Sequence, residues 1–273
     1  MNNKRRKQII AYIGLSLFSI LAILPVLYVF LLALQTNAEA AAIPPTIIPA
    51  SPQFGNFQRI AERIPLGRYF SNSVIFSLST TIAVLVTSLF AAYATTKLRM
   101  RGRTFIISIF VGGVLIPPAI RAIPLYTMIA RMGLVDTWAG LSMPMMATGF
   151  GLFFMHQFMK TLPDSVVEAA RIDGCSEMRV VLQIIGPLAA PGLVTLFIYN
   201  FLFRWNDYLW PLVVTRRVWV TLPVGVSIFK TSEQLVTWNI IAAAAVVTLI
   251  PVLIMFFSIG GRIVKGIAFQ ASK

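Results

Sequence analysis

The sequence has little charge and almost no cysteine or histidine. Only 12% of its 273 residues are charged and 58% are hydrophobic, whereas soluble domains carry about 25% charged residues. So few polar groups could not cover the surface of a soluble chain of this length, and a disordered chain would be poor in hydrophobic residues. The single Cys175 excludes an internal disulfide, and together with the single His156 it excludes the familiar zinc and iron–sulfur spacings. The composition therefore predicts a membrane protein.

Motifs for catalysis and nucleotide binding are also missing. The sequence contains neither a Gly-x-x-x-x-Gly-Lys-Ser/Thr loop for ATP phosphates nor a Gly-x-Ser-x-Gly nucleophile turn. His156 is best interpreted as a hydrogen-bonded residue near a membrane interface, because a proton relay would need charged partners along its route. We expect no enzyme activity, no metal and no cofactor in this chain, so any ATP and Mg²⁺ must be bound by a partner.

Long hydrophobic runs are what the sequence does contain. Crossing about 30 Å of hydrocarbon takes about 20 helical residues. The runs do not alternate as the strands of a membrane barrel would, so closed backbone hydrogen bonding requires helices. We expect an all-α integral membrane protein with six transmembrane helices. The six runs cover residues 8–34, 71–96, 104–120, 138–159, 188–214 and 240–260.

The Lys and Arg residues predict the orientation of these helices. The basic segment before the first run resembles a secretory signal, but the run is far longer than a signal core of about 7–15 residues, so we expect an uncleaved first span. With both termini in the cytoplasm, fourteen Lys and Arg fall inside and eight outside, as the positive-inside rule requires. The net charge of +14 is then mostly a topology signal, and no basic groove with interleaved aromatics supports nucleic-acid binding. The predicted parts are a cytoplasmic segment 1–7, a transmembrane domain 8–262 and a cytoplasmic tail 263–273.

The cytoplasmic loop 160–187, between the fourth and fifth runs, has a pattern of its own. Pro163 stops the preceding helix, and Ser165-x-x-Glu168 has the spacing of a capping box, which predicts a short helix that starts near Val166. Gly174 can adopt the left-handed conformation that ends such a helix. A second helical segment is expected from near Ser176 to Pro187.

This loop resembles a known signature. The sequence Glu168-Ala169-Ala170, followed by Gly174 and then Pro187, is similar to the EAA motif of the membrane subunits of binding-protein-dependent ABC importers. The resemblance implies that the first helix is a coupling helix, held in a cleft of a cytoplasmic ATPase. Gly186 departs from the pattern, because the family usually has Leu before the proline. The coupling residues implied by the resemblance are Glu168, Ala169, Ala170, Arg171, Asp173 and Gly174.

Flanking motifs are similar to the carbohydrate-uptake branch of that family, typified by the maltose permease subunit MalG. They include Trp205-Asn206-Asp207-Tyr208-Leu209-Trp210 and Thr221-Leu222-Pro223-Val224-Gly225. The resemblance implies a type I ABC importer permease-like fold in the bacterial inner membrane. It also implies a second homologous permease subunit, an ATPase dimer, an extracytoplasmic solute-binding protein and a sugar, polyol or glycerol-phosphate-type solute.

Charged side chains inside the fifth run form the second candidate site. Arg204 and Asp207 are three residues apart and can meet on one helix face. Charges at membrane depth cost a few kcal/mol, so they should pair or face a polar cavity. One interpretation is an internal pair that holds helices together. The other is a translocation path lined by Arg204, Trp205, Asn206 and Asp207.

Rival functions remain open from the sequence alone. A secondary transporter or channel without an ATPase would need a coupling-ion site, but the predicted spans offer almost no carboxylate besides Asp207. An integral membrane enzyme would need a catalytic constellation at the interface, and none is recognisable.

Overall fold

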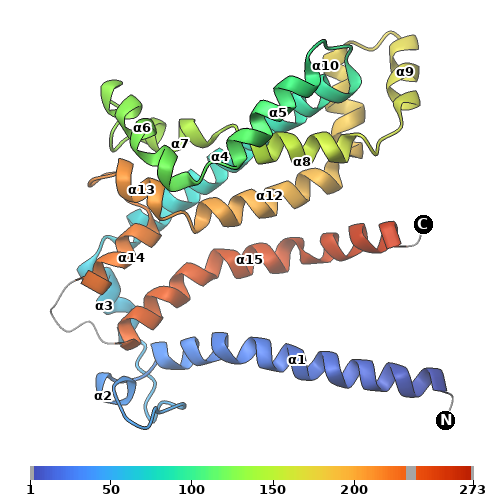
Figure 1. Cartoon of the computed structure of the whole chain (residues 1–273). Coiled ribbons are helices and arrows are strands. Elements are labelled where there is room, and N and C mark those ends of the chain that lie inside the picture. Colours follow the sequence, from blue (N-terminus) through green and yellow to red (C-terminus); the bar gives the residue numbers. More distant parts are fainter. Residues whose placement is uncertain (1–2, 232–237, 272–273) are drawn as a thin grey trace. The chain divides into compact units, whose positions relative to one another are not determined.

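The computed structural model describes residues 3–231 and 238–271, and within these ranges every regular element is helical (Figure 1). Four of the described helices are long and apolar enough to cross a membrane, and the number rises to six if each of two bent helix pairs is one span. The predicted all-α membrane architecture is therefore confirmed. The chain divides into two compact units, Met1–Gly67 with Gly225–Pro251 and Arg68–Val224 with Val252–Lys273.

The first unit contains α1 (Asn3–Ala33), α2 (Asn37–Ala40) and α3 (Gly55–Arg63). Amide side chains hold the chain where α1 ends. The buried Asn56 side chain donates to the carbonyls of Ala33 and Gln35, both at 2.9 Å. Asn239 donates to the Gln35 carbonyl at 2.8 Å. These bonds satisfy carbonyls that the end of a helix leaves without intrahelical partners.

The second unit holds the long α4 (Leu66–Lys97), which begins at the unit boundary, together with α5 (Arg103–Val114), α8 (Gly149–Met159) and α12 (Ala190–Trp205). These four helices run alongside one another in Figure 1. The remaining elements either are short or have residues in both units. They are α6 (Pro118–Arg131), α7 (Trp138–Ser142), the 3₁₀ turn Met143–Met145, α9 (Asp164–Ile172), α10 (Glu177–Arg179), the π-helix Val180–Ile185, α11 (Gly186–Leu188), α13 (Leu209–Val214), α14 (Leu222–Thr231) and α15 (Trp238–Ala271).

The third, fourth and fifth hydrophobic runs are each interrupted. In the fourth run, residues 146–148 separate α8 from the 3₁₀ turn that follows α7. In the third run, Pro117 precedes α6, and α5 and α6 are bent by 101°. Proline cannot continue a helix from the preceding residue without clash, which explains the break. In the fifth run, α12 ends at Trp205 and α13 starts at Leu209. The segment Glu177–Leu188 makes an angle of 77° with α12.

The main hydrophobic core of the second unit joins the membrane helices to the loop 160–187. Tyr93 of α4, Met155 of α8 and Leu196 of α12 belong to the same buried cluster as Val167 and Val181 of the loop. The loop is therefore packed onto the end of the helices, and Figure 1 draws α9 and α10 at that end.

Two glycines, Gly140 and Gly149, allow neighbouring segments of this chain to approach closely. A Cβ atom on Gly140 would lie 2.1 Å from the Leu134 carbonyl oxygen, and one on Gly149 would lie 2.3 Å from that of Phe110. By contrast, nothing lies within 4 Å of a Cβ added to Gly113. Close packing of α5 against α8 therefore depends on Gly149.

At the opposite end of α4, polar side chains hold the segment that precedes α14. The Asn72 amide donates to the carbonyls of Val218 and Val220 at 2.8 and 2.9 Å. The Ser73 hydroxyl accepts a hydrogen bond from the Leu222 amide at 2.7 Å. The first turns of α4 are thus bonded directly to residues 218–222.

Candidate functional site

The first helix of the loop 160–187 begins earlier than the capping-box pattern predicts. Its first residue is Asp164, and Pro163 occupies the N-cap position with no side-chain cap hydrogen bond. The predicted reciprocal cap between Ser165 and Glu168 is therefore wrong. Asp164 in the first turn still complements the helix dipole. Gly174 has φ +77°, so the predicted left-handed turn after the helix is confirmed.

The second half of the loop is helical, as expected, but most of it is not an α-helix. The Ser176 hydroxyl caps α10 by accepting from the Arg179 amide at 3.4 Å. Residues Val180–Ile185 then form a π-helix that leads into α11, with Pro187 at its second position. Such π segments are rare and often lie at functional sites.

The residues of the EAA motif divide between an inner and an outer face of α9. Ala170 is 5% exposed and packs with Val167 into this chain's own core. Glu168 and Ala169 are exposed. Ile172 is also exposed, at 86%, although it is a large aliphatic residue. The outer face of α9 therefore presents a carboxylate, a small side chain and an apolar side chain together.

An ion pair closes the turn around Gly174. The Arg171 guanidinium, which precedes the turn, bonds to both carboxylate oxygens of Glu177, which follows it, at 2.8 and 3.2 Å. The Tyr93 hydroxyl of α4 also donates to Glu177, and Arg171 donates to the Lys97 carbonyl at 3.3 Å. We call this set of four residues the clasp. It ties both arms of the turn to the end of α4.

Lys97 fixes the beginning of α9. Its ammonium donates to Asp164 Oδ1 at 2.6 Å and to the Leu162 carbonyl at 2.7 Å, and its side chain is only 4% exposed. The hydrogen bond and the positive charge of Lys97 lower the pKa of Asp164. The start and the end of α9 are thus both held at the last turn of α4.

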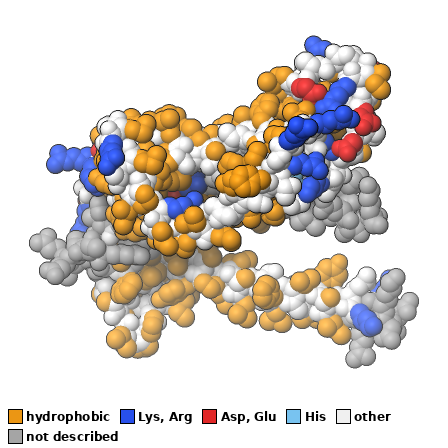
Figure 2. Space-filling view, turned by 45° about the horizontal axis from the view of Figure 1, so that its top comes forward, with side chains coloured by type: hydrophobic (Ala, Val, Ile, Leu, Met, Phe, Trp, Pro, Cys, Tyr) orange, Lys and Arg blue, Asp and Glu red, His pale blue; other side chains and the backbone are white. Residues whose placement is uncertain are grey.

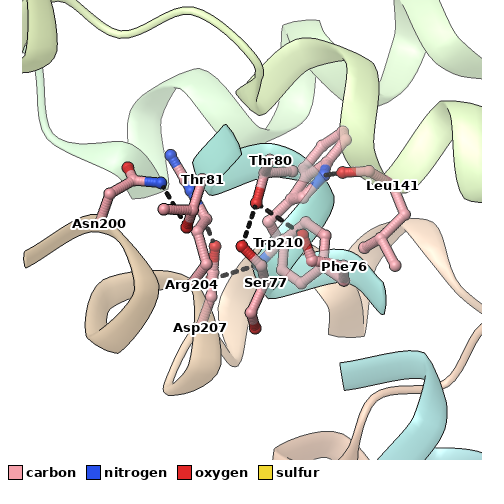
Figure 3. A network of polar contacts seen from close by, with 9 residues as sticks. All are labelled: Phe76, Ser77, Thr80, Thr81, Leu141, Asn200, Arg204, Asp207 and Trp210. Carbon is pink, nitrogen blue, oxygen red and sulfur yellow. Dashed lines mark hydrogen bonds and ion pairs between the residues drawn. The ribbon is translucent and has the colours of Figure 1, made fainter. Parts of the chain in front are cut away.

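The second candidate site lies where α12 ends (Figure 3). Arg204 Nη1 and Asp207 Oδ2 are 3.1 Å apart, and the side chains are 8% and 13% exposed. Asn200, one turn earlier, donates to the Thr81 hydroxyl of α4 at 3.0 Å. Trp210 donates from its ring nitrogen to the Leu141 carbonyl at 2.9 Å. The bond of Asn200 joins α12 to α4, and the bond of Trp210 joins α13 to α7.

The residues predicted for the translocation path do not share one environment. Arg204 and Trp205 are 7% and 2% exposed, and Trp205 packs between Phe201 and Phe70 with ring centroids at 6.0 and 5.7 Å. Asn206 is exposed, and its side chain donates to the Leu202 carbonyl at 2.8 Å. Arg204 Nε is buried with no hydrogen-bond partner among the described residues. Burial of Arg204 and Trp205 favours the helix-packing interpretation for these two side chains.

Sequence reasoning missed a third set of polar contacts, at Asp136. This residue has φ 58°, and its carboxylate accepts hydrogen bonds from the backbone amides of Arg217, Val218 and Trp219 at 2.9–3.1 Å. Partial burial raises the pKa of Asp136, but these backbone bonds outweigh it and lower the pKa overall. The partners are more than 80 residues away in the chain, so no local motif signals this contact.

The fold and the loop define a class of protein: a multi-spanning helical membrane protein whose loop 160–187 is helical and bonded to the end of α4. Residues 83–268 match the family model described as "Binding-protein-dependent transport system inner membrane component". This match covers more than half of the chain, and the chain belongs to that family. The resemblance read from the EAA motif is therefore confirmed.

Individual relatives agree with the family assignment over almost the whole chain. The sn-glycerol-3-phosphate transport system permease protein UgpE of Pectobacterium atrosepticum is 32% identical over 276 residues, 98% of each chain. The protein of the same name from Yersinia pestis is 30% identical over 275 residues, again 98% of each. A solved bacterial ABC transporter involved in the import of the acidic polysaccharide alginate has a chain with a TM-score of 0.80 and 22% identity, covering 96% of this chain and 98% of that chain. The last likeness confirms the ABC importer permease fold.

Proposed function

We propose that this chain is the solute-translocating subunit of an ATP-driven importer and that α9 transmits the movement of a partner ATPase to the membrane helices. One observation carries the proposal: α9 exposes Glu168, Ala169 and Ile172 while both of its ends are bonded to α4. An exposed helix that is fixed to a long membrane helix can transmit a push, whereas a loose loop would absorb it.

The assembly proposed here contains a second homologous permease subunit, an ATPase dimer that binds ATP and Mg²⁺, and an extracytoplasmic solute-binding protein. The loop 160–187 faces the ATPase in the cytoplasm, with both termini on the same side. The distribution of Lys and Arg supports this orientation. The differential stability of the two transport states is supplied by ATP binding and hydrolysis in the partner, as any two-state switch requires.

The proposed solute is a sugar, a polyol or a glycerol-phosphate-type ester. The names of the relatives that are 30–32% identical over 98% of the chain support the glycerol-phosphate member of this class. Of the predicted path residues Arg204, Trp205, Asn206 and Asp207, we assign only Asn206 to the wall of the translocation path. The exposed Asn206 side chain would face the path, while the ion pair of Arg204 and Asp207 would hold the helix end in place.

The test uses the assembled transporter in proteoliposomes, with ATP hydrolysis and solute uptake measured on the same samples. Glu168→Lys reverses the charge on the exposed face of α9, and Gly174→Val strains the left-handed turn. Gly102→Val is the matched control, because Gly102 has the same φ of +77° and lies outside the loop. A Cβ atom on either glycine would have no neighbour within 4 Å, so both substitutions place a β-branched residue at the same φ without a steric clash.

We expect Glu168→Lys and Gly174→Val to lose solute-stimulated ATP hydrolysis and uptake, and Gly102→Val to keep both. Normal solute-stimulated hydrolysis and uptake in both loop variants would show that α9 does not transmit the movement. Loss of activity in Gly102→Val to the same degree would show that backbone strain alone accounts for the result, and this would also contradict the proposal.

A further inference from the structure

A polar pocket lies beside the loop 160–187, where α4 ends, α5 begins and α8 ends. Its volume is about 390 Å³, and it is lined by the basic residues Lys97, Arg103 and Lys160. Asp164 contributes the one carboxylate of the lining, and Ile107 contributes the one hydrophobic side chain. The other lining groups are hydroxyl, amide and imidazole side chains. Packing of the loop against the membrane helices does not by itself require a cavity lined mainly by polar residues.

The charge of the pocket is positive because its single acid is already paired. Asp164 accepts from Lys97 at 2.6 Å. In the described part of the chain, neither Arg103 nor Lys160 forms an ion pair with an acid. A lysine ammonium has three N–H donors, and Lys97 uses one on Asp164 and one on the Leu162 carbonyl. Its third donor has no hydrogen-bond partner among the described residues.

The first turn of α5 adds backbone donors to these cations. Gly102 occupies its N-cap position and supplies no side-chain cap, and the first turn contains no acidic residue. The first four amides of a helix have no intrahelical acceptor, and the helix dipole favours an anion at this end. Arg103 and Thr104, the first two residues of α5, both line the pocket.

One wall of the pocket is held by a hydrogen bond between two side chains. His156 is 4% exposed, and its Nδ1 lies 2.9 Å from the Thr95 hydroxyl. Both side chains line the pocket, so its wall is fixed between α4 and α8 before any ligand enters. This contact also agrees with the expectation that His156 is a hydrogen-bonded residue.

We propose that this pocket binds a phosphate group, either that of an anionic lipid headgroup or inorganic phosphate from solution. A phosphate offers several acceptor oxygens, which match donors from Lys97, Arg103, Lys160 and the start of α5. Ile107 is the one hydrophobic residue in the lining, so a lipid would enter with its headgroup and leave its acyl chains outside. Figure 2 shows that Lys and Arg side chains gather at this end of the second unit, which gives an anion an attractive approach.

The test measures binding to the purified full chain in neutral detergent, so it requires neither the ATPase nor uptake. One arm titrates inorganic phosphate against chloride at constant ionic strength. The other titrates short-chain phosphatidylglycerol, with the matching diacylglycerol as the ligand that lacks a phosphate. Native mass spectrometry counts bound lipid, and the thermal unfolding midpoint reports the binding of either ligand.

The test variant is Arg103→Gln/Lys160→Gln, and the matched control is Arg131→Gln/Arg179→Gln. The control removes the same charge from exposed positions on α6 and α10, and neither residue lines this pocket or the cavity beside it. Lys160→Gln alone serves as a second test variant, because Lys160 is exposed and its loss should not affect folding.

We expect the wild type and the control to bind one of the two phosphate ligands about tenfold or more tightly than the test variant, because charged hydrogen bonds are lost. Tight binding of phosphatidylglycerol but not of inorganic phosphate would identify the lipid as the source, and the reverse would identify the free ion. Equal binding by all variants, equal binding of diacylglycerol, or no binding by the wild type in either arm would overturn the proposal.

Discussion

The ion pair between Arg204 and Asp207 gives the sharpest test of how the core of the second unit is stabilised. The charged atoms are 3.1 Å apart, and the side chains are 8% and 13% exposed. At an effective dielectric constant of about 20, such a pair attracts by about 5 kcal/mol, and the cost of removing both charges from solvent offsets most of this energy. The loss of one partner is expected to be far more harmful than the loss of both.

The substitutions Arg204→Met and Asp207→Asn each leave one buried charge without its partner. Each should lower the free energy of unfolding by about 3–5 kcal/mol. The double variant removes both charges and should lose much less than the sum of the two single losses. Arg204 Nε already lacks a partner among the described residues, so removing the guanidinium also removes an unsatisfied donor. Asp207→Asn should therefore be the more damaging single change.

Unfolding is measured on the full chain in mixed micelles of increasing denaturing-detergent fraction. Tryptophan fluorescence is a suitable signal, because Trp205 and Trp210 are 2% and 4% exposed and lie beside the pair. The substitution Asn206→Ala serves as the control, since Asn206 is exposed and its side chain donates only to the Leu202 carbonyl of its own helix among the described contacts. Single variants that each lose less than about 1 kcal/mol, or a double variant that loses the full sum, would refute the reasoning.

Further changes test the local geometry. Gly174→Asn should support more solute uptake than Gly174→Val, because Asn tolerates the φ of +77° and a β-branched residue does not. Equal uptake by the two variants would contradict this. Gly149→Ala should cost about 1–3 kcal/mol, since its Cβ would lie 2.3 Å from the Phe110 carbonyl, whereas Gly113→Ala should leave the unfolding midpoint unchanged. Asp136→Asn should destabilise the chain at neutral pH by about 1–3 kcal/mol. Because the pKa of Asp136 is lowered from 3.8, the difference from wild type should persist above pH 3.8 and shrink as the pH falls below it, as thermal unfolding across pH would show.

Local chemistry explains which parts of the fold could be predicted from the sequence. Hydrophobic runs identified the membrane helices, and Gly174 marked the turn after α9. Both signals lie in consecutive residues: the first in the length of a hydrophobic run, the second in the conformation that a glycine can adopt. The break in the third run follows from Pro117, because a proline disfavours helical conformation in the residue before it. The break at Asn206 had no such marker, because the chain turns there to bring Asp207 against Arg204 and Trp210 against Leu141.

The candidate site was predictable only in part, for a similar reason. The spacing of Glu168, Ala169 and Ala170 identified the loop, but it could not show that Ala170 faces this chain's own core. Lys97 is 67 residues from Asp164, and Tyr93 is 84 residues from Glu177. Contacts at such separations are set by packing of the helices, so single-sequence patterns do not report them.

The bonds at the two ends of α4 make this helix a mechanical link between α9 and residues 218–222. One end holds α9 through Lys97 and the clasp, and the other holds residues 218–222 through Asn72 and Ser73. With 32 residues and a rise of 1.5 Å for each, α4 is a rod about 48 Å long. A sideways displacement imposed at the α9 end of a stiff helix produces a displacement in the opposite direction at the far end, about any pivot in between. Movement of α9 would therefore be transmitted to residues 218–222, at the other end of α4, through a single helix.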